Sequence, residues 1–114
     1  MGSRFVEGQV VTVFRSRLRD GVGREGGDYA DLSRELQEAA RAMPGFVDFK
    51  TFVAEDGERV SLVTFASAAA HDAWRDDPRH RRAQRRGRRE FYAEYSIQVG
   101  PSTHTHEWSA GEDT

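Results

Sequence analysis

Two segments with strand character lie on either side of Asp56-Gly57, and this arrangement restricts the fold more than any other feature of the sequence. The segments FVDFKTFVAE and ERVSLVTFAS, residues 46–55 and 58–67, are rich in β-branched and aromatic residues, which favour strands. Asp-Gly suits the positive backbone angles of a two-residue hairpin turn. The sequence therefore predicts an antiparallel hairpin, and the fold must contain a sheet that includes it.

The chain before this hairpin contains one strand pattern and one helix pattern. Residues 9–19 are mostly apolar and β-branched at their start, which predicts a strand. From Asp28 to about Met43, apolar side chains recur three and four positions apart, which predicts a helix that Pro44-Gly45 ends. A strand and then a helix are therefore expected before the hairpin.

Short helices and a final strand are expected after the hairpin. Ser67 can cap a helix that ends near Arg75, and an aspartate before Pro78 favours a second helix start, with Gly87 as its stop. Residues 91–99 follow as an aromatic and apolar strand. With the short helices counted as one connection, the order is strand, helix, strand, strand, helix, strand. This order is typical of the α+β, ferredoxin-like βαββαβ fold with an antiparallel sheet.

Regular alternation along each expected strand predicts which side chains share a face of the sheet. In the first strand, one face carries Val10, Thr12, Phe14 and Leu18, and the other carries Val11, Val13, Arg15 and Arg17. In the first strand of the hairpin, one face carries Val47, Phe49, Thr51 and Val53, and the other carries Phe46, Asp48, Lys50 and Phe52. In the last strand, one face carries Phe91, Ala93, Tyr95, Ile97 and Val99, and the other carries Tyr92, Glu94, Ser96 and Gln98. Apolar side chains thus occur on both faces, although helices are expected to cover only one. Since an apolar sheet face must be buried, we expect a homodimer in which two sheets enclose an α+β barrel.

Domain organisation follows from the same pattern. Residues 8–100 form the expected domain, and residues 101–114 form a C-terminal tail that is partly disordered or packs on the partner subunit through Trp108. His104 and His106 would point the same way on an extended tail, but two ligands are too few for a metal site. No metal is therefore expected.

Composition and charge exclude several classes of protein. A chain of 114 residues without cysteine is expected to form one domain, with no thiol chemistry and no cysteine-rich metal site. It has no apolar run as long as a membrane span and no apolar block of a signal peptide near its start, so a cytoplasmic protein without a membrane partner is expected. Eight of the seventeen basic residues lie between Arg75 and Arg89, but no aromatic residue is interleaved with them. This cluster is interpreted as a solvated helix face, and no nucleic-acid partner is expected.

The arginine-rich helix has one stripe without arginine, formed by His80, Ala83, Gln84 and Gly87. This stripe is expected to face the protein interior, so that His80 approaches Trp74 and the last strand. A tryptophan, a histidine and an aromatic strand can line a pocket for a flat organic molecule. Alternatively, Trp74 anchors the core and His80 is a hydrogen-bonded residue at a helix start. The residue types support both interpretations.

Three stretches of the sequence together resemble the antibiotic biosynthesis monooxygenase family of small dimeric α+β barrels. They are MPGFVDFKTF, VSLVTFAS leading into AHDAW, and DPRHRRAQRRGRREFYAEYSIQV. From Trp74 at the end of the second stretch into the third, the sequence resembles the family's succession of a tryptophan, a proline-histidine segment, a glycine with arginine, and an aromatic strand. The resemblance covers about residues 8–100 and implies a ferredoxin-like fold in a dimeric barrel. The same scaffold carries several activities.

One branch of the family oxidises polycyclic phenols to quinones with molecular oxygen and without flavin or metal. The resemblance therefore implies a cofactor-independent monooxygenase acting on an aromatic, polyketide-like phenol. Such a site needs an apolar cavity, aromatic packing, and a group that favours the phenolate. The catalytic residues that we expect are His80, Trp74, Tyr92, Tyr95 and Arg15, and the substrate-binding residues are Trp74, Phe14, Phe49 and His71. In this scheme Arg15 stabilises the anion, while His80 or a tyrosine orients the phenol or moves its proton.

Two alternatives belong to other functional classes. The haem-degrading branch of the family uses an axial histidine with an asparagine and a tryptophan beside the porphyrin. His80 or His71 could bind haem beside Trp74, but the chain contains no asparagine. The other alternative is a non-catalytic barrel that binds a small aromatic ligand without converting it.

Overall fold

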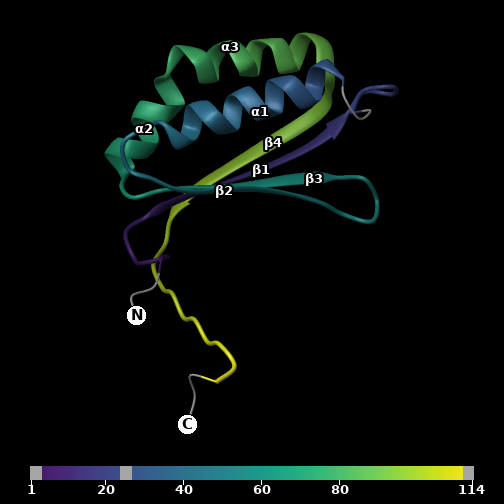
Figure 1. Cartoon of the computed structure of the whole chain (residues 1–114). Coiled ribbons are helices and arrows are strands. Elements are labelled where there is room, and N and C mark those ends of the chain that lie inside the picture. Colours follow the sequence, from purple (N-terminus) through teal and green to yellow (C-terminus); the bar gives the residue numbers. More distant parts are fainter. Residues whose placement is uncertain (1–3, 24–26, 112–114) are drawn as a thin grey trace.

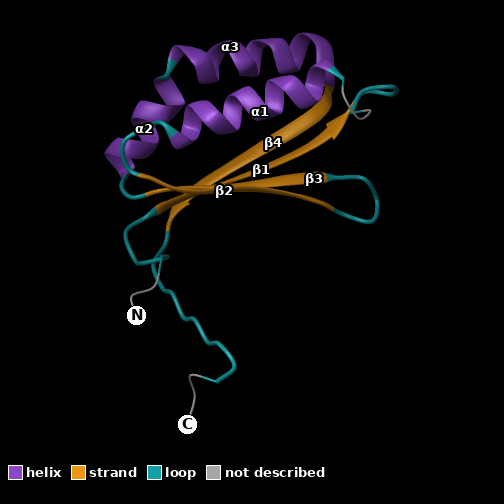
Figure 2. Ribbon diagram, in the orientation of Figure 1, coloured by secondary structure: helices purple, strands orange, loops and turns teal. Residues whose placement is uncertain are grey.

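The computed structural model describes residues 4–23 and 27–111 and has two layers, a sheet and a group of helices (Figure 1). Its elements are β1 (Val10–Leu18), α1 (Asp28–Arg41), β2 (Phe46–Val53), β3 (Arg59–Phe65), α2 (Ala68–Asp76), α3 (Pro78–Arg86), the π-helical turn η1 (Gly87–Phe91) and β4 (Tyr92–Pro101). The strands pair in the order β2-β3-β1-β4, and every pairing is antiparallel. Figure 2 shows the helices together on one face of this sheet. The predicted ferredoxin-like α+β fold is therefore confirmed.

Side-chain caps start the two short helices where the sequence predicts them. The Ser67 hydroxyl accepts a hydrogen bond from the Ala70 N–H at 3.1 Å, at the start of α2. The Asp77 carboxylate accepts one from the Arg79 N–H at 2.8 Å, and Pro78 occupies the first turn of α3. Each cap satisfies a backbone donor that the helix itself leaves free. The Asp77-Pro78 junction therefore separates α2 from α3 and sets where His80 can lie.

The core lies between the sheet and the helices and contains two clusters of buried side chains. Phe65 is only 1% exposed and packs between Phe46, with ring centroids 5.9 Å apart, and Trp74, at 6.2 Å. The members of the first cluster are Ala39, Ala40, Val63, Phe65 and Trp74, and those of the second are Leu32, Ala83 and Phe91. Burial of aromatic side chains on this scale is the main stabilising contribution in a domain of this size.

A bulge in β2 changes one predicted face. Phe46 pairs with Phe65 and Asp48 pairs with Thr64, so Val47 has no partner on β3. The extra residue reverses the alternation at the start of the strand. Phe46 therefore packs on the helix side against Phe65, whereas regular alternation wrongly placed it on the face of Asp48.

A second bulge, in β4, places Tyr92 and Tyr95 on the same face of the sheet, although the sequence predicted opposite faces. Leu18 pairs with Tyr92, and Arg17 pairs with Glu94, which leaves Ala93 without a partner. Tyr92 consequently occupies the position that Ala93 would take in a regular strand, on the same face as Tyr95. The two tyrosines lie on the helix side of the sheet, and the prediction that they occupy opposite faces is wrong.

The hairpin turn also differs from its prediction. Ala54 N–H donates to the Glu58 carbonyl at 2.8 Å, and Gly57 N–H donates to the Ala54 carbonyl at 2.9 Å, so the loop consists of Glu55, Asp56 and Gly57. Gly57 has a φ of +89°, but no described residue other than glycine has a positive φ, and this includes Asp56. The turn is therefore a three-residue loop with glycine in the left-handed position, rather than a two-residue loop with both residues there.

Gly45 connects α1 to β2 in a conformation that requires glycine. Its φ is +81°, and a Cβ built on it would lie 2.6 Å from the Ala70 Cβ. We expect Gly45→Ala to lower the free energy of unfolding by about 2–4 kcal/mol, because backbone strain and steric overlap add. Gly57→Ala is the matched control, since Gly57 shares the positive φ but has open space around it. Chemical denaturation of both variants measures the difference. Equal decreases in the free energy of unfolding would contradict the contribution from steric overlap with Ala70.

The face of the sheet opposite the helices is open in the single chain. It carries apolar side chains on neighbouring strands, including the directly paired Val13 and Leu62, together with Val11 and Val60. Beyond β4, the described tail residues run away from the sheet, and Trp108 is 64% exposed (Figure 1). Residues 112–114 of the predicted tail lie outside the described residues.

No helix in the described part of the chain is both long enough and apolar enough to cross a membrane.

Candidate functional site

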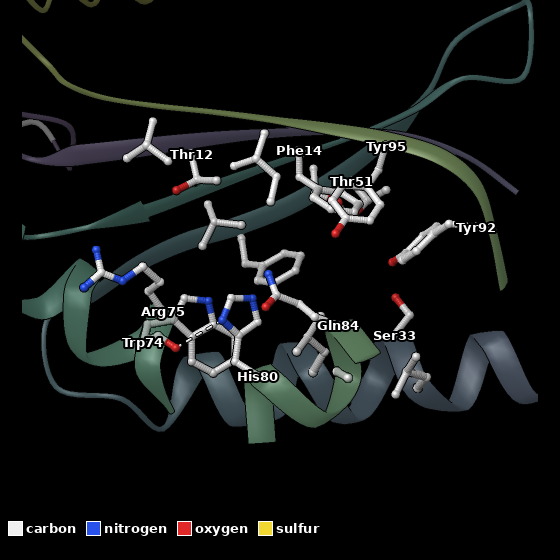
Figure 3. Close-up of a pocket in the computed structure, with 18 of the residues that line it drawn as sticks. Thr12, Phe14, Ser33, Thr51, Trp74, Arg75, His80, Gln84, Tyr92 and Tyr95 are labelled. Atoms are coloured by element: carbon white, nitrogen blue, oxygen red, sulfur yellow. Dashed lines mark hydrogen bonds between the residues drawn. The ribbon is translucent and has the colours of Figure 1, made fainter. Parts of the chain in front are cut away.

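A cavity of about 350 Å³ lies between the sheet and the helices (Figure 3). This volume is within the range of small-molecule sites. Its lining is Thr12, Phe14, Tyr29, Leu32, Ser33, Leu36, Phe49, Thr51, Ser61, Val63, His71, Trp74, Arg75, His80, Ala83, Gln84, Tyr92, Tyr95, Ile97 and Val99. Every predicted site residue except Arg15 is among them. The cavity is thus mainly apolar and aromatic, with polar groups at a few positions.

Trp74 and His80 form a parallel stack at one end of the cavity. Their ring centroids are 4.4 Å apart, with an interplanar angle of 15°. Trp74 is 5% exposed and also packs on Phe65 of the core cluster. The turn at Asp77-Pro78 separates the two helices, and His80 in the first turn of α3 lies against the indole (Figure 3). Trp74 is therefore both a core residue and a cavity wall.

The hydrogen bond of His80 defines which nitrogen carries its proton. His80 Nδ1 lies 3.1 Å from the Trp74 carbonyl oxygen. A carbonyl can only accept, so Nδ1 must be the protonated nitrogen and Nε2 keeps a free lone pair. Burial lowers the pKa of His80, and hydrogen bonding to the backbone of Trp74 and Arg75 only partly opposes this effect. His80 is therefore a neutral imidazole at neutral pH, with a basic nitrogen available to a ligand.

Aromatic residues with hydroxyl groups occupy the other end of the cavity. Phe14 stacks on Tyr95 at 5.3 Å between ring centroids and meets Tyr92 edge-on at 5.5 Å. Burial and the neighbouring Tyr29 raise the pKa of Tyr92, so its hydroxyl remains protonated and can donate. The Tyr95 oxygen accepts a hydrogen bond from the Arg88 guanidinium at 3.1 Å. Figure 3 shows the hydroxyls of Tyr92 and Tyr95 directed into the cavity.

His71 and Phe49 also lie where the sequence predicts them, on the cavity wall. The side chain of His71 is 12% exposed, and its Nδ1 is 3.0 Å from an Asp72 carboxylate oxygen. This contact orients the ring, and it leaves Nε2 without a described hydrogen bond. The cavity thus contains two histidines on successive helices.

Arg15 is the one predicted site residue that the structure does not bring to the cavity. It lies on the open face of β1, and its guanidinium makes two hydrogen bonds to Glu58, at 2.7 and 3.2 Å. The pairing with Arg15 holds the pKa of the Glu58 carboxyl below its ordinary value. On β1 the helix-side residues are the even-numbered ones, Thr12 and Phe14, so an odd-numbered residue points away. The prediction that Arg15 stabilises a bound anion in this cavity is corrected.

Several polar cavity residues were not predicted as site residues. Tyr29 and Ser33 reach the cavity from α1, Arg75 from α2 and Gln84 from α3, and the Thr51 and Ser61 hydroxyls bond to each other across β2 and β3 at 2.7 Å. The sequence indicated two of them in part, because Tyr29 lies at helical spacing from the apolar Leu32 and Leu36 of α1, and Gln84 belongs to the arginine-free stripe of α3. Stripe membership shows only that a residue faces inward, and does not distinguish a cavity wall from a packed core.

The tail histidines His104 and His106 were expected to be too few ligands for a metal site. Within residues 4–23 and 27–111, no group of three or more histidine, aspartate or glutamate side chains is arranged to hold a metal ion. His104 and His106 therefore have no third ligand of these types in the described chain.

Comparison with known proteins places the chain among solved structures of the same fold. Protein SO0527 from Shewanella oneidensis is 14% identical with a TM-score of 0.72, over 85% of this chain and 93% of that one. Rv0793 from Mycobacterium tuberculosis is 19% identical with a TM-score of 0.71, over 89% and 99%. SnoaB, a cofactor-independent oxygenase from Streptomyces nogalater, is 14% identical with a TM-score of 0.67, over 92% and 99%. At these identities the similarity establishes the fold alone.

No curated protein sequence matches this chain significantly. The family model described as antibiotic biosynthesis monooxygenase matches residues 10–86, which is more than half of the chain and includes the cavity-lining parts of β1, α1, β2, β3, α2 and α3. The chain therefore belongs to the antibiotic biosynthesis monooxygenase family.

Proposed function

We propose that the cavity binds a flat polycyclic phenol and supports its oxidation by molecular oxygen without a metal or organic cofactor. The observation that carries this proposal is the unprotonated Nε2 of a neutral His80, stacked on Trp74 inside an apolar cavity. Family membership supports a monooxygenase-like role. The cavity geometry supports the substrate class, because opposed aromatic walls suit a planar molecule.

The first step is proton transfer from the phenol to His80 Nε2. The product is a phenolate beside an imidazolium, and the apolar surroundings strengthen the attraction between the two charges. The carbonyl of Trp74 continues to accept from Nδ1, which stabilises the charged ring. At the opposite end, the protonated hydroxyl of Tyr92 can donate to a second oxygen of the substrate. Arg15 has no part in this scheme.

The phenolate then supplies the electrons that reduce oxygen. It transfers one electron to O₂, and the phenoxyl radical and superoxide combine at the ring carbon opposite the hydroxyl. The His80 imidazolium returns its proton to the outer peroxide oxygen, and loss of the proton on that carbon with cleavage of the O–O bond then gives the quinone. The two protons and the released oxygen atom form one water molecule. One oxygen atom thus enters the product and the other leaves as water, and the substrate donates all the electrons.

Oxygen uptake tests this proposal. Purified protein is mixed with a series of two-ring, three-ring and four-ring phenols, and oxygen consumption and quinone absorbance are followed together. We expect one quinone per O₂ consumed, and ¹⁸O from labelled O₂ in the product. Saturable binding of the phenols without any oxygen consumption would instead indicate a non-catalytic binding barrel and contradict the enzymatic proposal.

The same nitrogen supports haem binding as a second candidate function. Because the Trp74 carbonyl holds its Nδ1–H, His80 would hold a haem iron through Nε2. Arg75 lines the cavity and would supply a positive charge to pair with a haem propionate, although it already forms ion pairs with Asp72 and Asp76. Titration with haemin separates the two candidates. A saturable Soret band that is lost in His80→Asn would favour haem, and its absence would leave the phenol proposal.

We also propose that the open sheet face forms a homodimer interface. Leu62 pairs with Val13 on this face, and such apolar neighbours are expected to be buried by a second copy. Leu62→Glu should convert a dimer to a monomer in analytical ultracentrifugation, because it places a charge in the interface. Arg85→Glu on the exposed side of α3 is the control and should remain dimeric. A dimeric Leu62→Glu variant, or a monomeric wild type, would contradict the proposal.

A further inference from the structure

We propose that Gly87 is a positioning residue for the cavity. The space left by its missing side chain holds the ring of Tyr92, and the position of that ring limits the size of the substrate. The selectivity part of this inference rests on the proposed function, whereas the positioning part concerns the protein alone.

Gly87 is not required by the backbone. Its φ of −57° and ψ of −47° are ordinary right-handed helical values, which any residue adopts. α3 ends at Arg86, directly before Gly87, as the sequence predicts, and Gly87 then begins η1. Alanine is a better helix former than glycine at such a position. A different constraint must therefore account for the glycine.

That constraint is the ring of Tyr92. A Cβ built on Gly87 would lie 2.3 Å from Tyr92 Cε2, 2.8 Å from Cδ2 and 3.4 Å from Cζ. The first two distances are shorter than van der Waals contact allows, so the ring must move if residue 87 has a side chain. The ring of Tyr92 thus lies against Gly87 along its Cδ2–Cε2 edge.

Other contacts leave the ring few directions in which to move. Its centroid is 5.5 Å from that of Phe14, 5.6 Å from that of Tyr95 and 6.1 Å from that of Tyr29. Its backbone is fixed by the bulge in β4 and by a 3.0 Å hydrogen bond from Arg19 Nε to its carbonyl. The free volume beside the ring is the cavity that Tyr92 lines. A methyl group at residue 87 is therefore expected to displace the ring into the cavity.

Displacement of one wall affects large substrates before small ones. We expect Gly87→Ala to lower the ratio of kcat/KM for a four-ring phenol to that for a two-ring phenol by roughly tenfold, as expected for a contact the size of a methyl group. The loss should lie mainly in KM, because His80 and Trp74 are at the other end of the cavity. Gly100→Ala is the matched control, since a Cβ on Gly100 meets nothing within 4 Å. Its selectivity ratio should equal that of the wild type.

The Tyr92→Leu background shows whether the effect acts through the ring. Gly87→Ala should lower Tm by roughly 5–10 °C in the wild-type background, because of the overlap. In Tyr92→Leu the same substitution should leave Tm unchanged or raise it, because only the helix preference of alanine remains. Its effect on the selectivity ratio should also disappear. If Gly87→Ala alone does not fold but the double variant does, the positioning role is supported as well.

Equal changes in Tm caused by Gly87→Ala in both backgrounds would overturn the positioning role. An unchanged selectivity ratio in Gly87→Ala, with phenols still oxidised, would overturn the size limit while leaving the proposed function intact. If the wild type neither binds nor oxidises any of the phenols, the proposed function and the size limit both fail. The comparison of Tm values needs no ligand and still decides the positioning role.

Discussion

Replacing His80 with asparagine is expected to lower kcat/KM for phenol oxidation by about 10²–10⁴-fold, which is the usual contribution of a general base. Asparagine can donate to the Trp74 carbonyl as Nδ1 does, but it has no basic nitrogen in the position of Nε2. The variant should therefore keep the wild-type circular dichroism spectrum. The rate of quinone formation in a stopped-flow or steady-state assay measures the effect.

The pH dependence gives a second test of the same residue. Only the neutral imidazole accepts a proton, so kcat/KM should rise as the pH increases through the pKa of His80 and then level off. Because burial lowers this pKa, the half-maximal value should occur below pH 6.5, the ordinary value for histidine. His104→Asn in the tail is the control and should keep the wild-type rate and profile. Unchanged turnover in His80→Asn would remove His80 from the mechanism.

Replacing Trp74 with alanine is expected to lower the free energy of unfolding by about 3–5 kcal/mol. The indole is 5% exposed and packs on both Phe65 and His80, so its removal leaves a void in the core as well as in the cavity wall. A loss of this size is a large fraction of the total stability of an ordinary domain. Thermal or chemical denaturation should show it as a lower Tm or a lower denaturation midpoint.

Trp108→Ala is the matched control, because Trp108 is the other tryptophan of the chain and is 64% exposed. Its substitution should change the free energy of unfolding by no more than about 0.5 kcal/mol. Trp74→Phe should keep most of the stability but weaken phenol binding, because a smaller ring covers less of the ligand. A stable Trp74→Ala variant that still binds phenols with wild-type affinity would contradict both roles.

The sequence predicted the order of the elements and the two capped helix starts because these depend on local chemistry. An aspartate or serine caps a helix in nearly any tertiary context, and Pro78 fixes its own backbone angle. The convergence of Trp74 and His80 followed from helical spacing alone. These predictions needed no knowledge of strand pairing, and all are confirmed.

The faces of β2 and β4 could not be predicted, because a bulge depends on how two strands pair. Regular alternation assumes that each residue has one partner, and Val47 and Ala93 have none. Tyr92 was therefore assigned to the wrong face. Arg15 was wrongly placed for a different reason, since an arginine after apolar residues fits a cavity as well as an open face. The two positions are distinguished by the face of β1 on which Arg15 lies and by its ion pair with Glu58, which directly precedes β3.

The bulge at Ala93 also determines where β4 could lose one residue without changing which side chains face the cavity. If one residue were deleted elsewhere in β4, every residue on one side of the deletion would turn to the opposite face of the sheet. Deleting Ala93 would instead leave Tyr92 opposite Leu18, and Tyr95 opposite Ser16, as they are now. An alignment gap at this position therefore keeps the cavity wall in register, whereas a gap placed a few residues later would match cavity residues with residues of the opposite face.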